Sequence, residues 1–326
     1  MRSKLANVSV GLGVFLIVAA ALVRFYAYPS LATVPADYEG ITKLEAKGAQ
    51  IFNSDPDVLK TETSDLDISS RTIADSGAKA PDGDVVWVNS TTVKRADGTI
   101  FQQSRERAPF NAKSGAGVDC KSCDSWTEVA AGDREPVTRT GQIYKFPFGT
   151  QKHGYPVWDD ALGKATTAKF AGEEKLDGLT VYKFVQTIPD TMIETREVPG
   201  KIFGSTEPSV QAEMWYSMTR TFWVEPQSGS PVNRVENRVQ ELRYDGVSVP
   251  AFTGTVQYTK AQVDELVSDG KSNARMLSGL QLTFPLIMLI VGIVLLGGGL
   301  VLGRSAQHGR SDGGASKKKD PALAGV

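Results

Sequence analysis

Cysteine and histidine are scarce in this sequence, and charge of neither sign dominates it. With 2 cysteines and 2 histidines in 326 residues, the chain has too few of these ligands for a zinc or iron–sulfur site. Its 36 basic and 37 acidic side chains leave a formal net charge of −1, so no global basic field exists to concentrate nucleic acid. We therefore expect no metal, no cofactor and no nucleic-acid partner.

Residue patterns that mark common catalytic sites are also missing. His153 is the one histidine outside the C-terminal tail, and no G-x-S-x-G motif supplies a serine nucleophile. Asp159 with Asp160, like Glu173 with Glu174, forms an adjacent carboxylate pair. Neighbours in a strand point to opposite faces, so these pairs fit solvated surface better than a shared acid–base site. The sequence predicts no catalytic residue and a protein that is not an enzyme.

Charge is absent from two long apolar runs, one near each end of the chain. Residues 6–23 and 276–303 contain no charged side chain. About 20 apolar residues cross a hydrocarbon core of roughly 30 Å, so both runs predict membrane-spanning helices. The second run is longer than needed, and we expect its buried part at residues 282–302.

The first run also fits a cleaved secretory signal, because Arg2 and Lys4 precede a short apolar stretch. Arg24 follows the run directly, and the aromatic residues Phe25 and Tyr26 come next. Aromatic side chains at this position are typical of a membrane–water boundary. We therefore favour an uncleaved anchor over a signal peptide.

Basic residues outside the two runs predict the orientation in the plasma membrane. Two spans place both termini on one side, and lysine and arginine are enriched on the cytoplasmic side. The basic residues in these flanks are Arg2, Lys4, Arg304, Arg310, Lys317, Lys318 and Lys319, against Asp312 and Asp320. We expect both termini to be cytoplasmic and the large middle segment to be extracytoplasmic.

The chain thus divides into four predicted parts. They are an N-terminal transmembrane signal anchor (1–24), an extracytoplasmic domain (25–275), a C-terminal transmembrane helix (276–303) and a disordered basic cytoplasmic tail (304–326).

The middle segment contains short runs of β-branched and aromatic residues that end at turn dipeptides. Residues 85–93 and 99–103 flank Asp97 and Gly98 and predict a β-hairpin. Similar runs cover residues 179–187, 219–224, 231–244 and 254–258. Because strand follows strand without intervening helices, we expect a mainly β (α+β) domain of antiparallel sheets, flanked by two transmembrane α-helices.

Two segments of the middle part show other patterns. Residues 260–270 carry their apolar side chains on one side and predict a helix leading to the second span. Residues 33–53 are ambiguous, since Gly40 and Gly48 interrupt any helical stripe.

Cys120 and Cys123 form a C-x-x-C motif in a glycine-containing loop. A redox-active pair needs a stabilised thiolate in a βαβ setting, and Asp119 and Asp124 oppose thiolate formation. We favour a structural disulfide between the two cysteines; a redox pair or a shared metal ligand is the alternative.

Gly299 and Gly303 form a G-x-x-x-G motif in the second span. Small residues at this spacing allow close helix packing, and Gly11 and Gly13 of the first run are the candidate partners. Chance is the alternative explanation, because glycine is common in membrane helices.

Several segments carry distinctive combinations of aromatic residues, glycine and proline. They are residues 11–16 (GLGVFL), 24–26 (RFY), 144–150 (YKFPFGT), 155–159 (YPVWD), 207–210 (EPSV) and 220–226 (RTFWVEP). Over nearly the whole chain, these segments resemble an actinobacterial two-transmembrane cell-envelope family, members of which are called PorA-family porins. The resemblance implies a plasma-membrane protein with a part in building or exporting envelope lipids and lipoglycans, and it supplies no catalytic residue.

Three functions remain open from the sequence. The first is a non-enzymatic envelope protein that binds or transfers a membrane lipid or lipoglycan precursor, which requires a sizeable apolar cavity in the middle domain. The second is an oligomeric, porin-like channel, since two uncharged helices of one chain cannot enclose a pore. The third is a scaffold for envelope-biosynthesis proteins.

Overall fold

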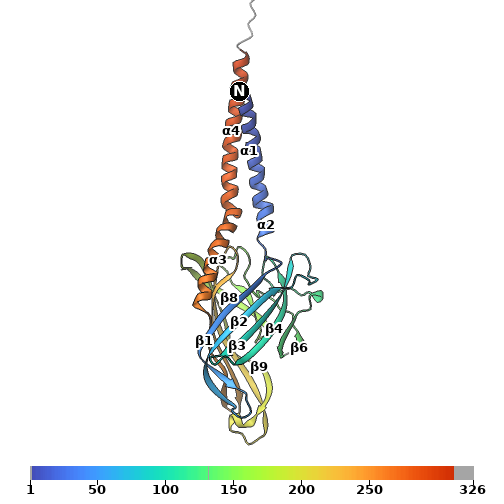
Figure 1. Cartoon of the computed structure of the whole chain (residues 1–326), viewed down its shortest axis with the longest axis vertical. Helices are drawn as coiled ribbons and strands as arrows, with labels where there is room; N and C mark the ends of the chain where they lie inside the picture. The colour runs from blue at the N-terminus through green and yellow to red at the C-terminus, as the bar shows by residue number, and fades with distance from the viewer. Residues whose placement is uncertain (1, 131, 312–326) are drawn as a thin grey trace, which may run out of the picture. The chain divides into compact units, whose positions relative to one another are not determined.

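The protein is described by a computed structural model that covers residues 2–130 and 132–311 (Figure 1). The chain forms two compact units. One is helical and combines the segment up to Leu31 with the segment from Met276 onwards. The other, Ala32–Arg275, contains every strand and is called the β domain here. The expected mainly β, antiparallel fold with an apolar helix at each end is confirmed.

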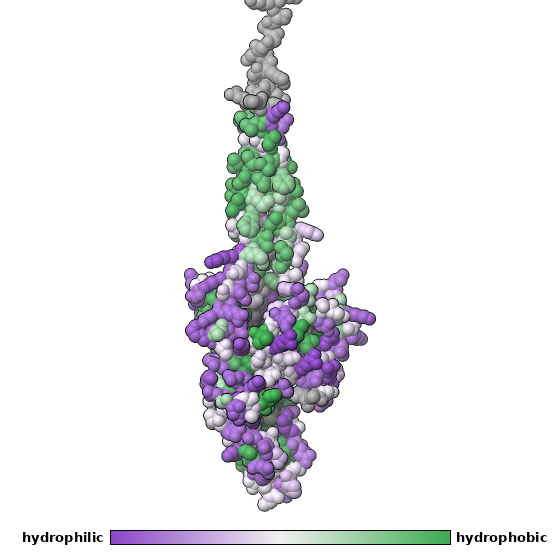
Figure 2. Space-filling model, in the orientation of Figure 1, coloured by the Kyte–Doolittle hydropathy of each residue, from purple (hydrophilic) through white to green (hydrophobic). Residues whose placement is uncertain are grey.

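The helical unit consists of two long helical segments. The first comprises α1 (Arg2–Leu22), the π-helical turn η1 (Val23–Ala27) and α2 (Tyr28–Leu31); the second comprises the π-helical turn η4 (Gly279–Thr283) and α4 (Phe284–Ser311). Both segments are long and apolar enough to cross a membrane. On the face seen in Figure 2, apolar side chains cover most of the coloured part of this unit. Large apolar residues such as Phe15 and Val294 are exposed, as expected for helices whose surroundings are lipid or other apolar helices.

Helices α1 and α4 pack against each other through small residues. On α1 the buried positions are Ala6, Gly13 and Ala20, and on α4 they are Pro285, Gly292 and Gly299. Each set recurs every seventh residue, the spacing that keeps one narrow face of a helix against its partner. Because these side chains are small, the two backbones approach closely.

Of the two glycines in the G-x-x-x-G motif, Gly299 is the one that packs closely against α1. A Cβ added to Gly299 would lie 2.8 Å from Val10 Cγ2 and 2.9 Å from Ala6 O, whereas one added to Gly303 would reach Ala6 Cβ only at 3.9 Å. On α1 it is Gly13 that meets the partner helix. A Cβ there would lie 2.7 Å from Gly292 O, while one at Gly11 would meet nothing within 4 Å.

The segment predicted to be a disordered tail begins as helix. Helix α4 continues to Ser311, because arginine, alanine and glutamine in this stretch are good helix formers that let the helix propagate. Residues 312–326 lie outside the described chain.

We predict that Gly13→Val separates α1 from α4, because the new side chain would overlap the backbone of Gly292 and Leu296. Such overpacking costs about 1–3 kcal/mol. The measurement is denaturant-induced unfolding of the helical unit in detergent, followed by a cysteine cross-link between the two helices. Gly11→Val is the matched control, and equal effects of the two variants would contradict the packing described here.

All strands of the β domain belong to one 12-stranded antiparallel sheet. Its order is β6-β5-β4-β3-β2-β1-β12-β11-β10-β9-β8-β7, so neighbours in the sheet are neighbours in sequence except where β1 meets β12. The strands are β1 (Glu39–Asn53), β2 (Lys60–Ala74), β3 (Asp84–Arg95), β4 (Ile100–Asn111), β5 (Trp126–Ala130), β6 (Asp133–Pro136), β7 (Tyr155–Asp159), β8 (Lys164–Leu176), β9 (Leu179–Pro199), β10 (Ser209–Val224), β11 (Pro231–Tyr244) and β12 (Val247–Tyr258).

The hairpin predicted at Asp97 and Gly98 is confirmed. Strands β3 and β4 pair on either side of Asp97 and Gly98 as predicted. The structure adds a hairpin that the sequence analysis did not predict, in which β8 pairs with β9 across Asp177 and Gly178. Within the ambiguous segment 33–53, residues 39–53 form strand β1. Gly48, which has a φ of +60°, lies in a β-bulge of this strand. The bulge shifts the strand by one residue, so that apolar side chains continue to point inward after it.

Helix α3 (Lys260–Ser278) packs on one side of the sheet, and the predicted helix at residues 260–270 is its first part. Val267 is buried in a cluster with Leu179 and Val232. A Cβ added to Gly270 would lie 2.8 Å from Leu179 Cδ2, so glycine at this position lets the helix approach the sheet closely.

The long connection between β6 and β7, residues 137–154, joins the two edges of the sheet. Its backbone is hydrogen-bonded to three separate places. Gly117 N donates to Gly141 O (2.8 Å), Gln142 N donates to Pro156 O (2.7 Å) and Phe146 N donates to Gly229 O (2.8 Å). Through these bonds the sheet closes around its own inner face.

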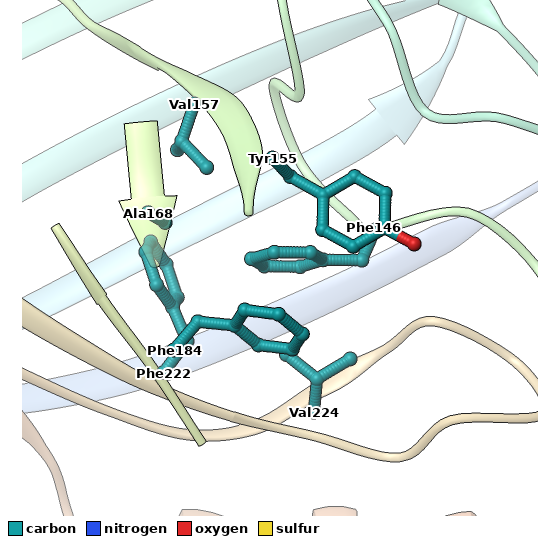
Figure 3. Close-up of a cluster of buried hydrophobic side chains, with 7 residues drawn as sticks. All are labelled: Phe146, Tyr155, Val157, Ala168, Phe184, Phe222 and Val224. Carbon is teal, nitrogen blue, oxygen red and sulfur yellow. The ribbon is translucent and has the colours of Figure 1, made fainter. Parts of the chain in front are cut away.

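The side chain of Phe146 lies in the main aromatic cluster of the β domain (Figure 3). Its ring stacks on Phe184 at 4.8 Å between centroids and meets Phe222 edge-on at 5.4 Å. Each such ring pair adds about 0.5–1.5 kcal/mol beyond area burial. The connection is therefore part of the core and not a surface loop.

Candidate functional site

A polar cavity of about 150 Å³ lies inside the β domain. The β6–β7 connection forms one wall, strands β1 to β3 form another, and β10 to β12 complete it. Its polar lining side chains are Tyr38, Thr42, Ser70, Thr72, Asn89, Gln142, Tyr144, Lys145, Arg234 and Tyr258. Trp87 and Phe146 are among the apolar ones. We call it the inner cavity.

Lys145 is buried at the inner cavity, with 7% of its surface exposed. Its ammonium lies 3.6 Å from the ring centroid of Phe148, and Nζ donates a long hydrogen bond of 3.5 Å to Lys113 O. Within residues 2–130 and 132–311, no carboxylate forms a salt bridge with it. Burial lowers the pKa of Lys145 to about 7, since nothing negative compensates its charge.

Trp87, another lining residue of the inner cavity, has a buried indole N–H without a hydrogen-bond partner in the described chain. Its ring stacks on Tyr38 with the centroids 4.4 Å apart and meets Phe110 edge-on. A buried, unpaired N–H costs about 1–3 kcal/mol, so such donors usually have a partner.

Short polar side chains from β2 and β3 line the same space. Asn89 Nδ2 donates to Ser70 Oγ (2.8 Å) and to Thr72 Oγ1 (2.7 Å), and Thr91 Oγ1 donates to Asn89 Oδ1 (3.1 Å). The inward faces of these strands are therefore hydrogen-bonded rather than apolar.

A buried ion cluster adjoins the inner cavity on strands β10 and β11. Arg220 Nε donates to Glu236 Oε1 (2.7 Å), and its terminal nitrogens reach Gln186 Oε1 (2.9 Å) and Asp159 Oδ2 (3.2 Å). Tyr216 donates to the same Asp159 oxygen at 3.0 Å. These bonds join Asp159, Gln186, Tyr216, Arg220 and Glu236 into one buried network.

Positive charge is in excess in this cluster. Besides Arg220, Glu236 is paired with Arg238 (2.8 Å) and with Arg234 (3.2 Å), which also lines the inner cavity. Burial by itself would raise the pKa of Glu236, but the three arginines outweigh it and hold that pKa far below its usual range. The three guanidinium groups are set against the carboxylates of Glu236 and Asp159.

A second buried cluster surrounds Arg139 of the β6–β7 connection. Its side chain is 0% exposed and is paired with Glu106 Oε2 (3.0 Å) and Asp160 Oδ1 (3.3 Å). Tyr144, on the cavity wall, donates to Glu106 Oε1 at 3.0 Å. Burial and the nearby Asp160 raise the pKa of Glu106 to about 7, against the opposing effect of Arg139.

An apolar groove of about 250 Å³ is the second hollow described in the β domain. It lies at the ends of β1, β9 and β11, next to the short helix η3 (Gly200–Phe203). Its lining residues are Phe52, Ser54, Pro56, Leu59, Arg196, Val198, Pro199, Ile202 and Leu242. Both hollows are smaller than the roughly 300–1,000 Å³ typical of pockets for drug-sized ligands.

The structure places the residues singled out in the sequence at separate positions. Cys120 and Cys123 are joined by a disulfide beside η2 (Lys121–Cys123), with their Cα atoms 5.3 Å apart. His153 is exposed and packs against the ring of Tyr155. Neither feature lies at the inner cavity.

The assignment of Asp159 to solvated surface is wrong. Asp159 is buried and binds Tyr216 and Arg220, because strand β7 turns its side chain inward. Asp160 is on the opposite side of the chain and reaches Arg139, whereas Glu173 is exposed as expected.

Arg220, Glu236 and Lys145 were not identified from the sequence as functional candidates. For Arg220 and Glu236, the alternation of buried and exposed positions along their strands contains a signal. In β10 the buried positions Tyr216, Met218, Phe222 and Val224 share the parity of Arg220, and in β11 Val232 and Leu242 share that of Glu236. A charged residue in phase with buried neighbours predicts a buried ion. Lys145 lies outside any strand, and no pattern marks it.

We predict that Glu236→Gln destabilises the β domain by about 3–5 kcal/mol, because three buried arginines lose their shared carboxylate. The matched control on the same strand is Glu241→Gln, which breaks a partly exposed pair with Arg243 and costs at most about 1 kcal/mol. Chemical unfolding of the full chain in detergent measures both. Similar losses in the two variants would contradict a central role for the cluster.

We also predict that Glu106 makes stability depend on pH. The folded chain holds the Glu106 proton up to about pH 7, whereas an unfolded chain releases it near pH ~4.3. The folded state therefore binds more protons between these values, and the unfolding free energy falls as pH rises through this window. Melting temperatures between about pH 5 and pH 7 should fall in the parent protein and stay level in Glu106→Gln. The exposed variant Glu173→Gln should retain the fall; a persistent fall in Glu106→Gln would exclude this carboxyl as its source.

The fold and the site define a class of membrane protein: two apolar helices attached to a single antiparallel sheet whose interior holds buried ion clusters. The chain belongs to the porin PorA family, whose model it matches over residues 5–301. Relatives named porin PorA occur in Corynebacterium resistens, at 24% identity over 51% of this chain and 56% of that protein, and in Corynebacterium amycolatum, at 32% identity over 30% of this chain and 32% of that protein. These alignments therefore span about half and about a third of the relatives' own length.

A solved structure also aligns with the chain. It is a putative exported protein with a YmcC-like fold from Bacteroides fragilis, covered over 92% of its length and over 71% of this chain at 10% identity. The TM-score is 0.19, so this likeness carries no argument about fold or function.

Proposed function

We propose that the protein is a non-enzymatic, porin-like channel subunit of the cell envelope that conducts as an oligomer. Membership of the porin PorA family, together with the names of its two relatives, is the observation that carries this proposal. The conducting path requires several copies, because α1 and α4 of one chain touch along their small-residue face and enclose no space.

The surface of the helical unit supports assembly of several copies. Outside the contact between α1 and α4, large apolar side chains such as Phe15, Val294 and Val301 are exposed in the single chain. Within a bilayer such side chains pack equally well against lipid or against the helices of a neighbouring copy.

The proposal includes a two-pass topology, with both termini cytoplasmic and the β domain on the outer side of the plasma membrane. The basic residues beside the two spans support it, since lysine and arginine favour the cytoplasmic side. A membrane-impermeant thiol reagent tests this orientation. It should label a cysteine introduced at exposed Lys169 in intact cells and fail to label one introduced at Lys4.

Planar-bilayer recording with the purified full chain tests channel formation. We expect discrete conductance steps, and native mass spectrometry of the same preparation should show an assembly of fixed copy number. Gly13→Val should reduce the conductance because it separates the helices of each subunit, while Gly11→Val should conduct normally. A protein that remains monomeric and never conducts would remove the proposal.

Binding or transfer of a lipid or lipoglycan precursor is a second candidate function, favoured by the apolar groove. Its volume of about 250 Å³ accommodates part of an acyl chain and not a whole lipid. Lipid analysis of the detergent-extracted protein should then show a lipid at fixed stoichiometry that is lost in Ile202→Asn. It should be retained in Ile100→Asn, which changes an exposed isoleucine of β4. An empty monomer that captures envelope-biosynthesis proteins would instead favour a scaffold.

A further inference from the structure

The helical unit contains one π-helical turn in each of its two segments. These turns, η1 and η4, contact each other, so they lie at the same level of the unit. Each turn ends two residues before a proline, Pro29 in the first segment and Pro285 in the second. Because proline has no N–H to donate to the preceding turn, the helical hydrogen-bond ladder is interrupted at both places.

The two prolines leave one backbone carbonyl in each turn without a helical N–H. Tyr28 N donates to Val23 O, five residues back, and η4 closes with the same kind of bond. A proline follows in both segments, so the helix itself supplies no donor to Arg24 O or to Leu280 O. Unpaired carbonyl groups are costly in hydrocarbon and are satisfied by water or by polar headgroups. We therefore expect this level of the helical unit to lie at the membrane–water boundary.

The sequence before η1 gives the same depth by a separate argument. Lys4 and Arg24 enclose an uncharged run, residues 5–23. At about 1.5 Å per residue this run is roughly 28 Å long, which is close to the thickness of a hydrocarbon core. Phe25 and Tyr26 follow it and are 78% and 73% exposed. Aromatic side chains gather in this way at headgroup level.

Arg24 is a positive charge without a negative partner at this level. Its guanidinium lies 5.9 Å from the ring centroids of both Phe25 and Tyr28, and within residues 2–130 and 132–311 it forms no salt bridge. Residues 2–31 and 276–311, the described part of the helical unit, contain no aspartate or glutamate. The two rings attract the guanidinium but do not neutralise it. Its planar fork of N–H donors matches the oxygens of a phosphate group.

We propose that the helical unit binds one anionic phospholipid at the η1 turn, with the headgroup phosphate held by the Arg24 guanidinium. The exposed ring of Phe25 lies beside that guanidinium and offers an apolar surface to the lipid below the headgroup. An anionic lipid is favoured because its single negative charge neutralises Arg24, whereas a zwitterionic headgroup also brings a cation. The inference rests on the membrane insertion included in the proposed function and does not require channel formation.

Native mass spectrometry tests the site. The full chain is reconstituted into vesicles of phosphatidylglycerol and phosphatidylcholine and then extracted with mild detergent. We expect one phosphatidylglycerol to remain bound per chain. Arg24→Gln should lower the fraction of chains that carry it by about fivefold or more, because the phosphate loses a charge-assisted fork. Arg304→Gln is the matched control, since it removes an exposed arginine of α4 in the same unit, and it should retain the lipid.

Two further measurements separate lipid binding from damage to the fold. Arg24→Gln breaks no ion pair, so the melting temperature and the cysteine cross-link between α1 and α4 should stay as in the parent. Arg24→Lys keeps the charge but not the planar fork, and it should retain an intermediate fraction of the lipid. Lipid loss in Arg24→Gln with an unchanged cross-link and partial rescue by lysine would support the site.

The results that would overturn the inference are distinct from those that bear on the channel. They are a parent protein that retains no phosphatidylglycerol at fixed stoichiometry, equal retention of phosphatidylcholine, or equal lipid loss in Arg24→Gln and Arg304→Gln. The last result would mean that only loosely surrounding lipid was detected. Conductance in planar bilayers is scored separately. A protein that conducts but retains no lipid would remove this site alone, and one that retains the lipid but never conducts would remove the channel alone.

Discussion

The β6–β7 connection is the constraint on which the rest of the β domain depends. A long antiparallel sheet ends in two strand edges with unpaired backbone groups, which natural proteins pair or cover. Here the edges are β6 and β7, and the chain that joins them bonds to β7 through Gln142 and to the turn after β10 through Phe146. Gly229, whose φ is +72°, lies so close to Phe146 O that a Cβ would reach it at 2.1 Å. Closure of the sheet, the aromatic core and the placement of Lys145 all follow from this one segment.

The interior that this closure creates is unusually polar. Arg139 and Arg220 are anchored by carboxylates from different strands, so each cluster joins parts of the sheet that are distant in sequence. Buried ion pairs add little net stability, because desolvation offsets most of their attraction, but removing one partner is costly. The clusters therefore specify how the strands and the connection come together more than they stabilise the fold. One of their arginines, Arg234, lines the inner cavity, whereas the cluster around Phe184 is hydrophobic.

The helical unit follows a different principle. Its contact consists of small residues on a seven-residue spacing, with Gly13 against Gly292, and none of its described buried positions is charged. In lipid such a contact is held by close van der Waals packing rather than by the hydrophobic effect. The contact between α1 and α4 is therefore apolar, whereas the cavity of the β domain is lined largely by polar side chains.

Local residue patterns were sufficient for the sequence to determine the spans, the hairpins and the antiparallel class. Uncharged runs at both ends and dipeptides such as Asp97-Gly98 act over a few residues, so they are readable without the fold. Alternation in β10 also contained the burial of Arg220, although its partners Asp159 and Glu236 come from other strands. Only the tertiary structure decided that residues 39–53 form a bulged strand, that Asp159 is buried, and that Lys145 and Trp87 line one cavity. Those outcomes depend on long-range pairing between the sheet and the β6–β7 connection, which no local period encodes.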